Sequence, residues 1–155
     1  MPTHYEGSDD EKRALNVYIK LMRAAESVGA RCLAPVTAQG LTSGQFGVLE
    51  SLLHLGPLTL GTLAEKHLKS PNNLTIVVDN LERNGMVRRE RDSKDRRVTW
   101  VHLTDKGRAC IAEVFPLHTR AIVENIAVLT VEEQQLLENL LRRLGKGVPR
   151  DDKTK

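Results

Sequence analysis

Two short amphipathic segments with almost no linker between them constrain the fold of this chain more than any other feature. The first covers residues 60–68, and only Lys69 separates it from Ser70-Pro71, the pattern of an N-cap followed by proline at the first helical position. The second segment, 71–84, carries apolar residues at i, i+3, i+4 and i+7, namely Leu74, Val77, Val78 and Leu81. Two short helices joined by so tight a turn predict a helix-turn-helix.

The segment that follows predicts a charged β-hairpin. Residues 86–91 and 98–103 have the composition of strands, and they flank a polar, turn-rich tip at 92–97. The window from Arg83 to Arg97 holds seven basic residues against three acidic ones, a net of +4, whereas the whole chain of 155 residues carries a net of +3. The positive charge is therefore concentrated in one place, as expected for a surface that meets phosphate.

Two helices are predicted before this region. Asp9 or Asp10 can cap a first helix, which should end before Pro35 because the residue that precedes a proline disfavours helical backbone. Residues 42–45, Thr-Ser-Gly-Gln, have the form of a capping box, in which the Thr hydroxyl and the Gln amide each bond a free backbone N–H. A second helix should therefore begin there.

Two more helices are predicted after the hairpin. Thr104 can cap a helix that reaches about Ala127, in which Pro116 should cause a kink or a break. A capping box at 130–133 begins a last helix that should end at Gly145. The broadest apolar stripe of the chain lies on this last helix: Leu136, Leu137, Leu140, Leu141 and Leu144. Only five residues are aromatic, so aliphatic side chains must fill the interior, which suits a mainly α fold with a small β-hairpin wing.

Several functional classes lack their usual signals. The two cysteines, Cys32 and Cys110, lie far apart without CxxC spacing, which is typical of reduced cytosolic thiols. No two of the five histidines are spaced at i,i+4, and no catalytic or nucleotide-binding motif is present, so we expect no metal, no cofactor and no enzymatic activity. No stretch approaches a membrane span and the first residues lack a signal-peptide core, which predicts a cytoplasmic location.

The outward face of the second short helix holds the first candidate DNA-binding residues. Six residues point away from the apolar stripe or flank those that do: Asn72, Thr75, Ile76, Asp79, Asn80 and Arg83. An isoleucine in this polar face is either a scattered surface residue or a contact for a thymine methyl in the major groove. Ser70, as the N-cap, and Asn72 and Asn73 lie at the helix start, where free backbone N–H groups favour a phosphate.

The hairpin tip holds the second set of candidates. A narrow minor groove attracts an inserted arginine, and we take Arg97 as the residue that inserts. Three further basic residues should lie along the DNA backbone: Arg91, Lys94 and Arg96. Asp95 can hold the tip arginine by a charged hydrogen bond, and Asp79 can likewise orient Arg83 or an arginine of the wing. The alternative is an ordinary charged edge that prevents sheet aggregation.

Three motifs resemble those of a known family. Residues 95–107, with the pattern DxRx5LTx2G, resemble the wing signature of the MarR family of bacterial transcription regulators. Residues 81–89, LEx2GMVxR, are similar to the end of that family's recognition helix, and 41–46, LTx2QF, to the start of its second helix. The resemblance implies a winged helix-turn-helix on each subunit of an obligate homodimer whose first, fifth and sixth helices interleave. It also implies a repressor or activator that binds palindromic double-stranded DNA and is released by a small ligand, often phenolic or anionic.

Dimerisation has separate support in the residues. The leucine stripe of the last helix and the apolar face of the first exceed what a small winged domain needs for its core, and a second copy would bury them. We therefore divide the chain into an N-terminal dimerisation helix at 1–38, a winged helix-turn-helix domain at 39–104, C-terminal dimerisation helices at 105–146 and a tail at 147–155 that we expect to be mobile.

An effector pocket is expected between the helical dimer region and the winged domain. Five residues are candidates to line it: Tyr18, Met22, Arg23, Phe46 and His54. Each of them also suits an ordinary core or surface position. Two alternative functions stay open, namely a winged helix that docks an acidic protein through its basic tip, and a redox- or metal-sensing form of the same regulator that uses Cys32, Cys110 or the histidines.

Overall fold

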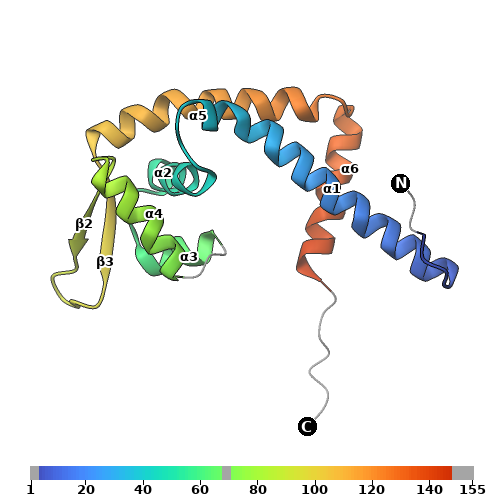
Figure 1. Ribbon diagram of the computed structural model, residues 1–155, viewed down its shortest axis with the longest axis horizontal. Helices are drawn as coiled ribbons and strands as arrows, with labels where there is room; N and C mark the ends of the chain where they lie inside the picture. Colours follow the sequence, from blue (N-terminus) through green and yellow to red (C-terminus); the bar gives the residue numbers. More distant parts are fainter. Residues whose placement is uncertain (1–3, 68–70, 148–155) are drawn as a thin grey trace, which may run out of the picture.

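A computed structural model describes residues 4–67 and 71–147, which form an arch of helices with one small sheet (Figure 1). The elements in chain order are α1 (Asp9–Ala38), α2 (Ser43–Leu55), β1 (Leu58–Thr59), α3 (Leu60–Lys66), α4 (Pro71–Arg83), β2 (Val87–Arg91), β3 (Thr99–Leu103), α5 (Asp105–Ile126) and α6 (Val131–Lys146). The winged module from α2 to β3 forms one end of the arch, α1 and α6 form the other, and α5 bridges them. The predicted mainly α fold with a β-hairpin wing is confirmed.

Hydroxyl side chains start the helices as predicted, with one exception. Three threonines accept a backbone N–H from the residue three positions further on: Thr42, Thr104 and Thr130. At the N-terminus the prediction of Asp9 or Asp10 as the cap was wrong, because Ser8 forms a capping box with Glu11. The two aspartates lie instead in the first turn, where carboxylates are favoured by the positive end of the helix dipole.

The prediction that the first helix ends before Pro35 was also wrong, since α1 continues beyond it. Pro35 has no N–H for the carbonyl four residues earlier, and this loss destabilises a helix. However, Cys32 and Val36 on either side of the proline are only 5% and 0% exposed. In addition, Nδ1 of His118 in α5 donates to the carbonyl oxygen of Cys32 over 2.8 Å. Burial and this hydrogen bond, which goes to the carbonyl next to the one that lacks its helical donor, stabilise α1 at this point.

The fifth helix ends as predicted, near Ala127, whereas the last helix ends later than predicted. The break considered at Pro116 does not occur, because α5 is a single helix that buries Ile111 and Val114 before the proline and Ala121 after it. The last helix does not end at Gly145, because Gly147 is the glycine with positive φ, 69°, and it caps α6. The rest of the predicted tail, 148–155, lies outside the described residues.

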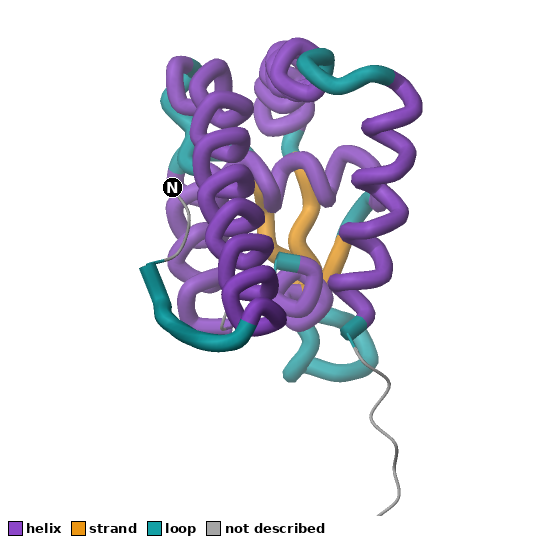
Figure 2. The backbone as a smooth tube through the Cα atoms, turned by 90° about the vertical axis from the view of Figure 1, so that its right-hand side faces the viewer, coloured by secondary structure: helices purple, strands orange, loops and turns teal. Residues whose placement is uncertain are grey.

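The sheet contains one strand that the sequence did not predict. The strand order of the sheet is β1-β3-β2 with antiparallel pairing throughout, so β3 is central and β2 is an edge strand. β2 and β3 form the predicted hairpin, in which Arg89 faces Val101. Figure 2 shows the strands side by side with helices around them. β1 is only two residues long, too short for any periodicity to reveal.

The winged module has its own apolar core. It is built from buried side chains of α2, α3, α4 and the sheet, together with two residues of α5: Leu49, Leu52, Leu63, Leu74, Val78, Leu81, Val87, Val101, Ile111 and Val114. Because side chains alternate along a strand, Val87 and Arg89 point to the helix-covered face of the sheet, and Arg88 and Glu90 point to the other face.

The opposite end of the arch leaves its apolar side chains on the surface. None of the described residues of α6 is buried, and its five stripe leucines are 39% to 59% exposed. Val17, Tyr18 and Met22 of α1 are 50% to 61% exposed. Within the described residues no single helix is long and apolar enough to cross a membrane, and α5 and α6 meet that criterion only as a pair bent by 103°.

The contact between α5 and the base of the wing gives a stability prediction. A Cβ at Gly107 would lie 1.9 Å from the carbonyl oxygen of Met86, so the backbone would have to move to admit it. We expect Gly107→Ala to lower the free energy of unfolding by about 2 to 3 kcal/mol in urea denaturation. Gly61→Ala is the control, because its Cβ would meet only Thr59 Oγ1 at 3.9 Å. Equal stability of the two variants would contradict the close packing.

Candidate nucleic-acid interface

α4, the second helix of the helix-turn-helix, buries one face and exposes the other. The buried residues are Leu74, Val78 and Leu81. Ile76 is 59% exposed, and Thr75 and Arg83 are exposed beside it, as the helical wheel predicts. Nη1 of Arg83 donates to Oδ1 of Asn80 over 3.3 Å. The result is a polar helix face with one isoleucine, on an element of the width that the major groove admits.

The residues predicted at the start of this helix are only partly described. Ser70 lies outside the described residues, and the side chain of Asn72 is likewise not described. Asn73 is exposed. The phosphate-binding role of this helix start therefore stays a prediction.

A single aspartate organises the turn of the wing. Oδ1 of Asp92 accepts the backbone N–H groups of Lys94 and Asp95 over 2.8 and 2.9 Å, and Oδ2 accepts the indole N–H of Trp100 over 3.0 Å. The hydrogen bond from Trp100, followed by those from the two backbone N–H groups, lowers the pKa of Asp92. Sequence reasoning gave Asp92 and Trp100 no role, although an aspartate that opens a turn is a known signal for such backbone bonds.

The predicted charged hydrogen bond between Asp95 and Arg97 is present at the tip. Oδ1 of Asp95 accepts the backbone N–H and the Nε of Arg97 over 3.0 and 3.1 Å, and Oδ2 accepts from Nη2 over 3.0 Å. The side-chain bond to Arg97 lowers the pKa of Asp95 and raises the pKa of Arg97. The Arg97 side chain is nevertheless 90% exposed, so its guanidinium is oriented and still accessible.

The other cations of the hairpin divide into paired and unpaired groups. Arg88 donates to Glu90 over 2.7 Å on the face of the sheet away from α4, and His102 approaches the same carboxylate at 3.4 Å. Three side chains are exposed and, in the part of the chain that the structure describes, make no hydrogen bond or ion pair: Arg91, Lys94 and Arg96. The unneutralised charge of the wing therefore lies at its tip and at Arg91, the residue before it.

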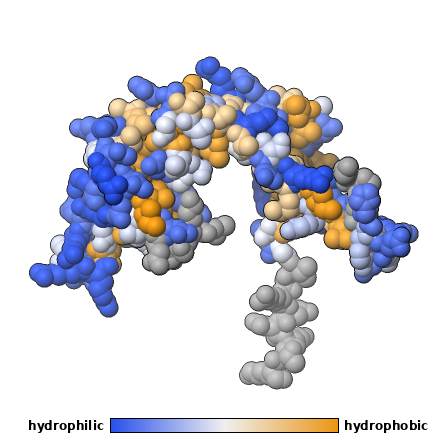
Figure 3. Space-filling model, in the orientation of Figure 1, coloured by the Kyte–Doolittle hydropathy of each residue, from blue (hydrophilic) through white to orange (hydrophobic). Residues whose placement is uncertain are grey.

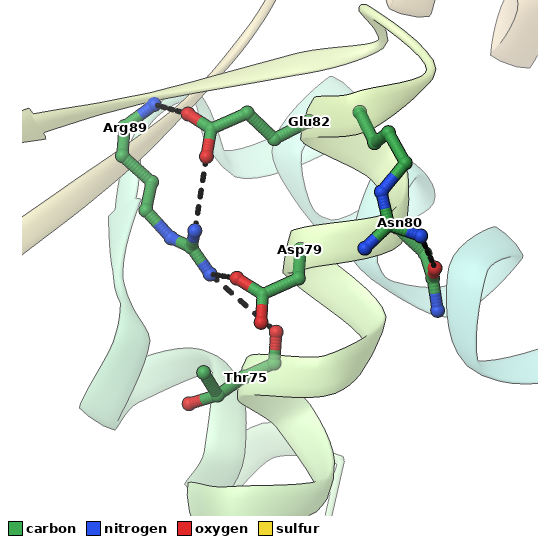
Figure 4. A network of polar contacts seen from close by, with 6 residues as sticks. Thr75, Asp79, Asn80, Glu82 and Arg89 are labelled. Carbon is green, nitrogen blue, oxygen red and sulfur yellow. Dashed lines mark hydrogen bonds and ion pairs between the residues drawn. The ribbon is translucent and has the colours of Figure 1, made fainter.

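Arg89 links the wing to α4; the sequence analysis considered a wing arginine beside Asp79 but did not identify Arg89 or the second carboxylate, Glu82. Its backbone N–H and its Nη1 both donate to the carboxylate of Glu82 over 2.9 Å, and its Nη2 pairs with Asp79 and approaches the carbonyl oxygen of Thr75 at 3.4 Å (Figure 4). Nε of Arg89 is buried and has no partner among the described residues. Of the two partners considered for Asp79, the structure selects a wing arginine over Arg83.

A signal for this contact was available in the sequence. Thr75, Asp79 and Glu82 are spaced at i, i+4 and i+7, which places two carboxylates on one side of α4. Two acids on the side of a helix that meets a basic hairpin indicate a buried or half-buried arginine partner. Which of the seven hairpin and helix-end cations it would be depends on the strand register, and the sequence does not determine that.

Comparisons with known proteins agree with this geometry. Residues 41–99 match the model of the MarR family. The chain is 36% identical over 137 residues to the HTH-type transcriptional regulator YkoM of Bacillus subtilis (strain 168), a match that covers 88% of this chain and 89% of YkoM. The chain belongs to the MarR family. Its relatives are transcriptional regulators, so this MarR-family protein is a DNA-binding regulator of transcription and not an enzyme.

Two further comparisons are with a transcriptional repressor and with a crystal structure. The HTH-type transcriptional repressor MdtR of the same organism is 28% identical over 138 residues, which cover 89% of each chain. The crystal structure of a MarR-like transcription regulator from Bacillus cereus ATCC 10987 superposes with a TM-score of 0.79 at 26% identity, over 88% of this chain and 98% of the other. The arrangement of winged module and helical arm is thus that of solved MarR-family structures.

The five residues predicted to line an effector pocket lie in different surroundings. Tyr18 lines an open pocket of about 560 Å³ with Tyr5, Glu11, Ala14 and Leu15 on the outer part of α1. Phe46 is buried with its ring edge-to-face on His118, at a centroid distance of 4.7 Å. Met22 and Arg23 are exposed on α1, and His54 packs on Phe115 at 4.8 Å. Their ligand role stays a prediction.

The cysteines and histidines of this MarR-family protein form no metal cluster within residues 4–67 and 71–147. Cys32 and Cys110 are both unpaired thiols, the first buried and the second half-buried. Burial raises the pKa of Cys110, which lowers the fraction of reactive thiolate.

The wing turn of this MarR-family protein gives a pH prediction. Because the folded-state pKa of Asp92 lies below its ordinary value of 3.8, the ionised carboxylate stabilises the turn above that value, and the contribution is lost as the pH falls through the folded pKa. The NMR signal of the only tryptophan's indole N–H should shift with a midpoint below 3.8, while far-UV circular dichroism is still native. Asp92→Asn keeps an acceptor and should show no such transition. A midpoint at or above 3.8 would contradict the assignment.

Proposed function

We propose that this chain is a homodimeric repressor that binds a palindromic operator with α4 in the major groove and the wing tip, 92–97, in the adjacent minor groove. The observation that carries the proposal is the adjacency of two elements. The exposed polar face of α4 and a wing with unneutralised cations are tied together through Arg89 (Figure 4). A helix and a two-stranded arm in this relation can enter neighbouring grooves of one duplex.

Each candidate residue has a distinct role in this proposal. Ile76 contacts a thymine methyl, and Asn72, Thr75 and Asn80 meet base edges or phosphates. Arg97, oriented by Asp95, enters the minor groove. The remaining cations lie along the phosphates, together with the helix start: Ser70, Asn73, Arg83, Arg91, Lys94 and Arg96. Asp79 supports the interface by holding Arg89 rather than by touching DNA.

A second copy of the chain is the proposed partner of the α1 and α6 faces. The leucine stripe of α6 and the apolar residues of α1 are exposed, and orange patches are visible on the arm that contains these two helices (Figure 3). A surface of this kind marks an interface. A two-fold dimer would bury both faces and present two copies of α4 about 34 to 36 Å apart, which is one turn of DNA.

Repression and release are the finer parts of the proposal. A dimer on an operator excludes other proteins from the same DNA, and the similar protein MdtR is named a repressor. A small phenolic or anionic effector that binds better when the two α4 helices have another separation would release the DNA. The cytoplasm, where DNA is accessible, is the proposed location.

DNase footprinting on the DNA upstream of the chain's own gene tests the proposal. A protected palindrome is expected. An absence of protection at low salt would instead favour the adaptor function, in which the basic tip docks an acidic protein.

Dimerisation has its own test. Leu137 and Leu141 are 39% and 42% exposed on the α6 stripe, so placing carboxylates there should oppose pairing. We expect Leu137→Asp with Leu141→Asp to change the mass from that of two chains to that of one in light scattering. Leu55→Asp, at a leucine of α2 that is 54% exposed, is the control and should stay dimeric. A wild-type monomer would contradict the proposal directly.

The wing is tested by the salt dependence of DNA binding. Each phosphate contact that is lost should reduce the slope of log K against log salt by about one, so Arg97→Ala should flatten it by that amount. Arg88→Ala removes the same charge from the other face of the sheet, where Arg88 pairs with Glu90, and should leave the slope unchanged. Equal binding by wild type and Arg97→Ala between about 50 and 200 mM salt would exclude the wing contact.

A further inference from the structure

We infer that Arg89 is a positioning residue that sets the angle between α4 and the wing and thereby determines sequence specificity. The inference rests on the proposed function, since it assumes that helix and wing bind one duplex. It assigns Arg89 no contact with DNA.

The base of the wing is fixed by α5. The hydroxyl of Thr104 donates to the carbonyl oxygen of Gly85 over 2.6 Å, and Nζ of Lys106 donates to that of Asn84 over 2.8 Å. The backbone N–H of Thr104 also bonds the carbonyl oxygen of Met86 over 3.1 Å. These contacts hold the point at which the chain leaves α4, but they lie at one end of the hairpin. Further along the hairpin, β3 is held by its pairing with β1 at Val101 and Trp100, whereas β2 is an edge strand with no strand among the described residues on its other side.

Arg89 holds the hairpin further along its length. It is the middle residue of β2, and it reaches back to three residues on successive turns of α4: Thr75, Asp79 and Glu82. Glu82 binds both the backbone N–H and the guanidinium of Arg89, so one carboxylate fixes the edge strand and the side chain together. Across the ladder Arg89 is paired with Val101, which is fully buried, so the two side chains lie on the same face of the sheet.

The charges around Arg89 separate a positioning role from a phosphate-binding one. The Arg89 side chain is 24% exposed, and its single positive charge meets two carboxylates, whose side chains are 46% and 39% exposed. It therefore adds no net positive charge to the surface of the wing. Its loss should leave the number of phosphate contacts unchanged, while helix and wing lose their fixed relation. Operator binding needs both in register at once, whereas non-specific binding needs only charge.

The test compares two arginines that are adjacent in β2 and face opposite sides of the sheet. The probes are a duplex enriched by the wild-type protein from a random library and a scrambled duplex of the same composition. In Arg89→Met the ratio of the two Kd values should fall roughly tenfold, with an unchanged salt slope. In Arg88→Met, which loses the same charge, the ratio should stay within about twofold of wild type. Equal ratios for the two variants would overturn the inference.

A charge-neutral variant separates geometry from repulsion. Arg89→Met combined with Asp79→Asn and Glu82→Gln removes the unpaired carboxylates, and we expect discrimination to stay poor. Restored discrimination would mean that repulsion, and not the angle of the wing, caused the loss. Circular dichroism and light scattering check that the variants are folded and dimeric. If Arg89→Met does not fold, the single variant Asp79→Asn replaces it in the test. We expect a smaller fall in the ratio of the two Kd values, and an unchanged ratio would overturn the inference.

The outcomes distinguish a failure of the proposed function from a failure of the Arg89 inference. Failure of the wild-type protein to enrich any duplex would overturn sequence-specific binding and the Arg89 inference together. Enrichment, with no difference between Arg89→Met and Arg88→Met, would overturn the inference alone. A fall in the salt slope of Arg89→Met by about one would show that Arg89 binds a phosphate instead.

Discussion

The close approach of α5 to the turn between α4 and β2 is the contact on which the rest of the molecule depends. The hydroxyl of Thr104 caps α5 by accepting the N–H of Gly107, and it donates to the carbonyl oxygen of Gly85 at the end of α4. The absence of a side chain at Gly107 lets α5 meet the backbone of Met86. One junction therefore ends α4, starts the wing and directs α5 toward the far arm of the arch (Figure 1).

The cations of the hairpin beyond this junction differ in whether a carboxylate neutralises them. The charge of Arg89 is neutralised by two carboxylates of α4, and Arg88 is paired with Glu90 on the opposite face of the sheet. Arg97 is oriented by Asp95 but remains exposed. Because the carboxylates that pair with Arg89 lie outside the segment 83–97, the net charge of that segment is larger than the charge available to DNA. In the proposed function, the remaining charge of the wing meets phosphates while the exposed face of α4 enters the neighbouring groove.

The two ends of the arch differ in how they satisfy the hydrophobic effect. The winged module buries a continuous cluster within one chain, so its side chains need no partner. The described residues of α6 bury nothing, although its leucines are spaced as a core stripe. Amphipathicity without an intramolecular surface to cover it is the physical basis for the proposed dimer. The proposed regulation follows from the same division, because any change in how two such arms pair moves the two winged modules.

The sequence alone determined what depends on residues a few positions apart. Capping boxes, the apolar stripes of α4 and α6, the hairpin and the Asp95–Arg97 pair all arise from spacings that can be read along the chain, and they sufficed for the fold class. The family was indicated by the resemblance of three motifs. Only the tertiary structure decided contacts between distant residues. Asp79 pairs with Arg89 and not with Arg83, because the strand register turns Arg89 toward α4. The helix α1 passes Pro35 because buried neighbours and a hydrogen bond from His118, 86 residues from Cys32, stabilise it there. Such outcomes depend on how elements pack, and local propensity carries no information about that.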